Sequence, residues 1–76
     1  MTRYYFHIRD ELVVIPDDEG LDLLDMQAAR IEARLSALDL GMAEIRKGCG
    51  VDRRAIEIAD RKGKILETVP IRAFLH

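Results

Sequence analysis

The chain opens with a period-two alternation of apolar and polar side chains over residues 3–9, RYYFHIR. The apolar side consists of Tyr4, Phe6 and Ile8. The other side consists of Arg3, Tyr5, His7 and Arg9. This pattern predicts a strand with one face towards a core and one face towards water.

A second β-rich run, LVVIP, follows at residues 12–16 and predicts a hairpin with the first strand. Asp10-Glu11 is a poor sequence for a two-residue primed turn, so we expect a longer, bulged connection. Residues 16–25, PDDEGLDLLD, combine turn residues with a brief alternation at Leu21 and Leu23, which indicates a turn and then a short extended segment.

Asp25 stands before an unbroken run of helix formers and is a natural N-cap. The run predicts a helix from about Met26 to Lys47, which Gly48 would end. One apolar set recurs at alternating spacings of three and four residues, and we expect it to face the core: Ala28, Ile31, Leu35, Leu38, Met42 and Ile45. A second set lies roughly opposite: Met26, Ala29, Ala33, Ala37, Leu40 and Ala43.

A closing hairpin is predicted from RAIEIAD at 54–60, the turn DRKG at 60–63 and KILETV at 64–69. Ile56 and Ile58 are expected to point inward. If Asp60 pairs with Lys64, Ile58 faces Leu66 and Ile56 faces Thr68. The outer side would then hold Ala55, Ala59, Ile65 and Val69 around Glu57 and Glu67, which would sit in water or meet an arginine.

These elements predict a single α+β domain over residues 1–76. A small antiparallel sheet in ββαββ order would carry one long helix on one face, and a short turn at Ile71–Leu75 would close the chain.

Composition limits how so short a chain is stabilised. One cysteine, Cys49, and two histidines exclude an intrachain disulfide and a four-ligand Cys/His zinc site, so we expect no cofactor and no metal. A well-packed aliphatic core or a partner subunit remains. The net charge of −2 makes nucleic acid an unlikely partner. The early charges Arg3 and Arg9 and the lack of a long apolar run predict a soluble cytoplasmic protein without a membrane segment.

Several motifs form a pattern that runs along nearly the whole chain: the run from Arg3 to Ile8, Pro16-Asp17 with Glu19-Gly20, Leu24-Asp25 with Ala28-Ala29-Arg30, and Ile56, Ile58, Asp60 and Gly63. Together they resemble a family of small, mostly alphaproteobacterial proteins that is classed as a domain of unknown function. Members often have Asp-Gly after the first strand, where this chain has Asp10-Glu11. The resemblance implies no activity and no catalytic residue.

The sequence suggests three kinds of functional site: a metal site, a ligand surface and a catalytic site. The acidic run Asp17, Asp18, Glu19 and Asp22 lacks the spacing of an EF-hand, and turn and cap roles explain it better than a metal. The polar side of the first strand is the candidate ligand surface, where Arg3, Tyr5, His7 and Arg9 would bind a phosphate or a single-stranded nucleic acid. No catalytic residue is assigned, and we expect the protein not to be an enzyme.

The leading functional hypothesis is a small interaction or regulatory module that acts as a homodimer, with an unidentified protein partner also conceivable. A sheet and one helix bury only one face of each, which leaves apolar side chains unmatched. The residues expected at the interface are Met26, Leu40, Ile65 and Val69. The alternative is a small-ligand or nucleic-acid binder on the polar side of the first strand.

Overall fold

The protein's structure is a computed structural model that describes residues 1–46 and 54–74. Its strands are β1 (Thr2–Arg9), β2 (Val14–Ile15), β3 (Leu21–Leu23), β4 (Ala55–Ala59) and β5 (Ile65–Pro70). The helix α1 (Met26–Arg46) precedes β4, and the 3₁₀ turn η1 (Ile71–Phe74) follows β5. The expected end of the helix at Lys47 and Gly48, the loop at Cys49, and Leu75 lie outside the described residues.

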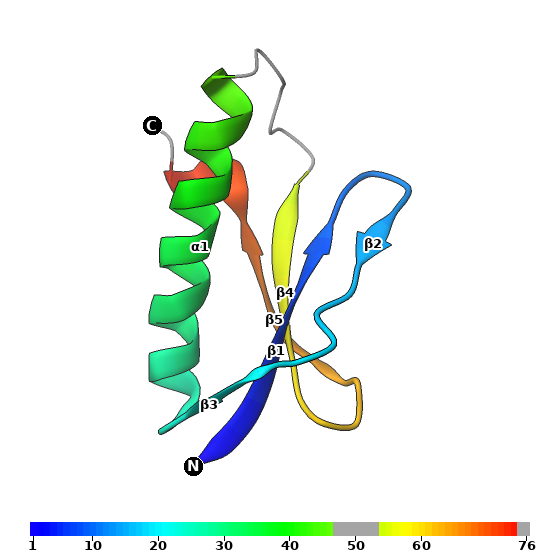
Figure 1. Ribbon diagram of the computed structural model, residues 1–76, viewed down its shortest axis with the longest axis vertical. Coiled ribbons are helices and arrows are strands. Elements are labelled where there is room, and N and C mark those ends of the chain that lie inside the picture. The colour runs from blue at the N-terminus through cyan, green and yellow to red at the C-terminus, as the bar shows by residue number, and fades with distance from the viewer. Residues whose placement is uncertain (47–53, 75–76) are drawn as a thin grey trace.

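All strand pairs are antiparallel, in the order β2-β1-β4-β5. The short strand β3 also pairs with β1, at its opposite end from β2: β2 pairs with Ile8 and Arg9, whereas β3 pairs with residues 2–4. Figure 1 shows α1 running along one face of this sheet. The predicted α+β fold is confirmed, with the difference that the extended segment before the helix joins the sheet as a strand.

The connection between β1 and β2 is longer than two residues, as the Asp-Glu sequence predicts. Arg9 pairs with Val14, and the Asp10 amide donates a hydrogen bond to the Val13 carbonyl at 2.8 Å. The strand that the sequence places at residues 12–16 is therefore reduced to Val14–Ile15.

The core lies between α1 and the inward face of the sheet. Its buried members are Tyr4, Ala29, Ala33, Ala37, Ile56, Ile58, Val69 and Ile71, with Phe6, Leu23, Met26 and Leu40 packed against them. The inward direction of Ile56 and Ile58 is thus confirmed, and the turn expected after Pro70 supplies Ile71 to the core.

The assignment of the two helix faces was wrong. Ala29, Ala33 and Ala37 are fully buried. The large members of the set expected inside lie outward instead: Ile31 is 51%, Leu35 61%, Leu38 42% and Met42 47% exposed. Ala28, from the same set, is partly buried. Large side chains already fill the sheet's inward face, so the small alanine face of α1 fits against it at interior packing density. The side chains of Ala43 and Ile45 lie outside the described part.

The register of the closing hairpin also differs from the expected one. Asp60 pairs with Lys64 as predicted, and Gly63 takes a positive φ of 88° in the turn. A bulge between Ile58 and Ala59 then shifts the pairing, so that Ile58 faces Glu67 and Ile56 faces Val69. The extra residue in β5 turns Val69 and Glu67 to the helix side of the sheet.

Of the residues expected at an interface, three therefore belong to the core of this chain. Val69 is 6% exposed, and Met26 and Leu40 pack against the buried cluster. Only Ile65, at 41% exposure, presents a large apolar surface. The glutamates meet arginines as expected: Glu67 binds Arg30 at 2.9 Å, and Glu57 binds Arg9 at 2.6 Å.

The N-cap of α1 is confirmed, because Asp25 Oδ1 accepts a hydrogen bond from the Ala28 amide at 2.9 Å. We expect Asp25→Ala to lower the free energy of unfolding by about 0.5–2 kcal/mol, since one helix-end donor loses its acceptor. Urea denaturation measures the change, and Asp25→Asn, which keeps the acceptor oxygen, is the control. Equal losses in both variants would contradict the capping role.

Candidate functional site

The polar residues of β1 lie together on the face of the sheet that points away from α1. Tyr5, His7 and Arg9 alternate with the inward residues, and β4 contributes Glu57 directly opposite His7. The Tyr5 and His7 rings are stacked, with centroids 6.4 Å apart and an interplanar angle of 18°. The sequence prediction that these side chains share one face holds, and we call this surface the outer sheet face.

Arg3 is engaged by the segment that carries β3. Its Nε and Nη2 atoms donate to the two carboxylate oxygens of Asp22, each at 3.0 Å, and its Nη1 donates to the Glu19 carbonyl. Such a bidentate pair fixes the plane of the guanidinium as well as its position. The Arg3 charge is therefore directed at the acidic segment, where it ties β3 to β1.

Arg9 is engaged by β4 through a single contact. Its Nε lies 2.6 Å from Glu57 Oε2, and the Glu57 residue is only 7% exposed. A carboxylate this buried requires a charged or hydrogen-bonding partner. The two arginines that make β1 a candidate phosphate surface are thus each paired with a carboxylate, which lowers the attraction of this face for an anion.

Asp17 fills the gap on the edge of β1 between β2 and β3. Its Oδ2 accepts a hydrogen bond from the Phe6 amide at 3.1 Å, and its Oδ1 accepts from the Glu19 and Gly20 amides at 3.2 Å. The Asp17 amide in turn donates to His7 Nδ1 at 2.9 Å. We call this set of contacts the Asp17 clasp.

The clasp explains the electrostatics of Asp17. Partial burial by itself raises the pKa of this carboxyl, but the Gly20, Phe6 and Glu19 amides together with the nearby His7 lower the pKa below its usual 3.8. The charged form is therefore the one that the fold stabilises. The acidic run thus has the structural role that its turn chemistry indicates.

Gly20 allows the clasp to close against β1. It has a φ of +73°, and a Cβ there would lie 2.9 Å from both the Tyr4 carbonyl oxygen and Tyr5 Cε2. A side chain at this position would therefore strain the backbone and collide with β1.

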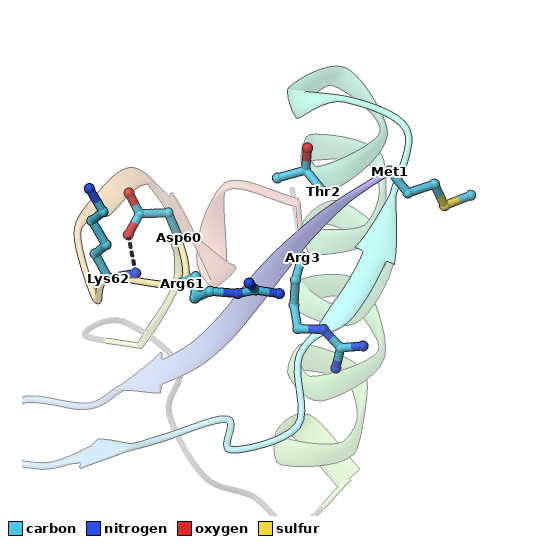
Figure 2. Close-up of a pocket in the computed structure, with 6 residues that line it drawn as sticks. All are labelled: Met1, Thr2, Arg3, Asp60, Arg61 and Lys62. Carbon is cyan, nitrogen blue, oxygen red and sulfur yellow. Dashed lines mark hydrogen bonds between the residues drawn. The ribbon is translucent and has the colours of Figure 1, made fainter.

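Two shallow depressions adjoin the outer sheet face beside the β4–β5 turn. One, of about 290 Å³, is lined by Tyr5, His7, Asp17, Asp18, Asp60, Arg61 and Gly63. The other, of about 400 Å³, is lined by Met1, Thr2, Arg3, Asp60, Arg61 and Lys62. Figure 2 shows the Arg61 side chain extending from the turn towards β1 in the second depression. Its dashed line is the hydrogen bond from the Lys62 amide to the Asp60 carboxylate, at 2.9 Å.

Sequence reasoning missed Asp60, Arg61 and Glu57 as neighbours of the first strand. The closing hairpin alone indicates a turn at residues 60–63, but only the pairing of β1 with β4 brings that turn beside Tyr5 and His7. The Asp60 carboxylate also accepts a hydrogen bond from the Lys64 amide at 2.9 Å, so its role is to stabilise the turn.

The described residues do not meet the requirements of a metal site or of a membrane-spanning helix. In residues 1–46 and 54–74, no three His, Cys, Asp or Glu side chains are grouped so as to hold a metal ion. Over the same residues, no helix has the length and apolar character needed to cross a bilayer.

A second distinctive surface lies on the far side of the helix. Its large aliphatic side chains are Ile31, Leu35, Leu38 and Met42, which we call the outward stripe. They recur every three or four residues, so they share one face of α1. This face is opposite the alanines that contact the sheet.

An antiparallel sheet with one helix on one face, a clasped acidic loop and a polar outer face defines a small α+β protein. The chain belongs to the family described as domain of unknown function DUF6894, which matches residues 3–72. The predicted resemblance to a family of unknown function is confirmed. No curated protein and no solved structure matches the chain.

We expect Gly20→Ala to destabilise the protein more than Gly63→Ala. Both glycines have a positive φ, but a Cβ at Gly63 meets open space. The control variant should lose about 1–2 kcal/mol for its backbone alone, and Gly20→Ala at least about 1 kcal/mol more for the collision with β1. Chemical denaturation of both variants gives the comparison, and equal losses would show that the close approach at Gly20 is dispensable.

We expect Asp17→Asn to lower stability at neutral pH, with a loss that shrinks in acid. Because the folded pKa of Asp17 lies below 3.8, its contribution is complete above that value and disappears as the pH falls through the folded pKa. Denaturation at neutral pH and near pH 3 measures the gap between wild type and variant. The control is Asp18→Asn, whose carboxylate is exposed and accepts no hydrogen bond within the described chain. A pH-independent gap would refute the charged clasp.

Proposed function

We propose that this chain is a non-enzymatic interaction module of the bacterial cytoplasm that acts as a homodimer through the outward face of α1. The observation that carries the proposal is the outward stripe, whose residues are 42–61% exposed. Single exposed aliphatic residues are normal on protein surfaces, but a continuous row of them along a helix marks an interface.

The stripe contributes little to the stability of one chain. The sheet is covered by the alanine face of α1 together with Met26 and Leu40, so polar residues at the outward positions would leave this core unchanged. Large aliphatic side chains stabilise a structure only where they leave water. Their presence at these positions therefore favours a state in which a second surface covers them.

A second copy of this chain is the occupant that we propose. Closed two-fold dimers are the commonest assemblies of small soluble chains, and such a short chain gains stability from one. An unrelated protein partner is the competing occupant, and sedimentation equilibrium distinguishes the two, because only self-association makes the purified protein dimeric.

A ligand-binding role for the outer sheet face ranks second. The observation in its favour is Arg61, which faces both depressions and forms no ion pair among the described side chains. Two observations argue against an anionic ligand. Arg3 and Arg9 are already paired with carboxylates, and Asp17, Asp18 and Asp60 line the smaller depression. Binding at Arg3, Tyr5, His7 and Arg9 stays a prediction.

We expect sedimentation equilibrium over a micromolar concentration series to give a dimer for the wild type and a monomer for Leu35→Glu. The matched control is Ile65→Glu, which places the same charge on an exposed aliphatic residue of the closing hairpin and should leave the dimer intact. Circular dichroism checks that both variants fold. A monomeric wild type would overturn the proposal, and dissociation by Ile65→Glu alone would move the interface to the hairpin.

A further inference from the structure

We propose that the two copies pair with their α1 helices parallel and in register, with Arg34 of each chain against Asp39 of the other. This inference rests on the proposed homodimer and specifies its geometry. The apolar stripe supplies the contact, and the charges beside the stripe select the orientation.

The stripe has the spacing of a two-helix seam. Ile31, Leu35, Leu38 and Met42 are separated by four, three and four residues, which is the a/d alternation of a heptad. Leu35 and Met42 take the a positions, and Ile31 and Leu38 take the d positions. From Ile31 to Met42 the stripe is about 16 Å long. In a parallel pair, each stripe residue would meet its own copy across the two-fold axis.

The residues that flank the stripe carry opposite charges on opposite sides. Arg34 precedes Leu35 on one flank and occupies a g position, whereas Asp39 follows Leu38 on the other flank and occupies the next e position. Both are exposed, and within the part of the chain that the structure describes neither joins a salt bridge. In a parallel pair, g of one helix faces the following e of its partner, so two Arg34–Asp39 contacts form.

An antiparallel pair would bring like charges together. The two-fold axis would then place each flank against the same flank of the second copy. Glu32 and Asp39 share the e flank, so carboxylates would face carboxylates, and Arg34 would lie near Arg34 of the second copy. Like charges in contact at an interface oppose association. The flanking charges therefore discriminate between the two orientations.

The fold restricts each chain to one helix face in the assembly. The side of α1 opposite the stripe is covered by the sheet, as the buried alanines show. Figure 1 shows the sheet on one side of α1 only. In the dimer both sheets lie outside the helix pair, and both outer sheet faces stay exposed.

Cysteine cross-linking separates the two orientations. Met42→Cys and Ile31→Cys are each made in a chain with Cys49→Ser, so that every chain has one thiol. In the parallel dimer each variant alone should form a disulfide-linked dimer on mild oxidation, because a residue at the seam meets its own copy within disulfide range. In an antiparallel dimer Met42 lies about 16 Å along the axis from its own copy, and it faces Ile31 instead. Links that appear only when the two variants are mixed would overturn the parallel geometry.

Charge reversal tests the Arg34–Asp39 contact independently. Arg34→Glu alone and Asp39→Lys alone should each raise the dimer dissociation constant roughly tenfold, since each places like charges at both contacts. The double variant should return the constant to near the wild-type value. A dimer that the single variants leave unchanged, or that Arg34→Glu tightens, would refute the contact. A wild type that is monomeric by sedimentation would instead refute the homodimer itself, so the two failures are distinguishable.

Discussion

The contact between the alanine face of α1 and the sheet is the constraint on which the other features depend. Ala29, Ala33 and Ala37 lose all exposure there, because the sheet presents large side chains such as Ile56 and Ile58. Small residues on one layer and large residues on the other fill the interior without a void. This match rotates the helix so that its larger aliphatic residues point outward, and the proposed interface is a direct consequence of that rotation.

The Asp17 clasp solves a second problem, the incomplete edge of β1. Two short strands cover the ends of that edge but leave the middle open, and a carboxylate takes the Phe6 amide that no strand pairs with. His7 completes the arrangement by accepting from the Asp17 amide. The motif that looks like a cation-binding run in the sequence therefore substitutes for a missing piece of strand. Backbone amides stabilise the negative charge of Asp17 by hydrogen bonding.

The molecule thus has two contrasting surfaces on opposite sides. The outer sheet face is polar, and the β1 arginines Arg3 and Arg9 are neutralised by Asp22 and Glu57. The outward face of α1 is apolar, and its flanking charges Arg34 and Asp39 find no partner within the described chain. Neutralised charges favour a structural role for the sheet face, whereas apolar side chains beside charges that the described residues leave unpaired support the proposal that α1 forms an interface. This contrast is why we rank association through α1 above ligand binding at the sheet.

Local chemistry by itself determined much of this protein. The alternation at residues 3–9, the Asp25 cap and the DRKG turn each act over a few residues, so the sequence predicts their elements and the shared face of Tyr5, His7 and Arg9. Only the tertiary structure decided which side of α1 is buried, because both sides are apolar and the choice depends on the volume that the sheet leaves free. The bulge that turns Val69 inward, and the approach of Asp60 and Arg61 to β1, were likewise decided by strand pairing between residues far apart in the chain.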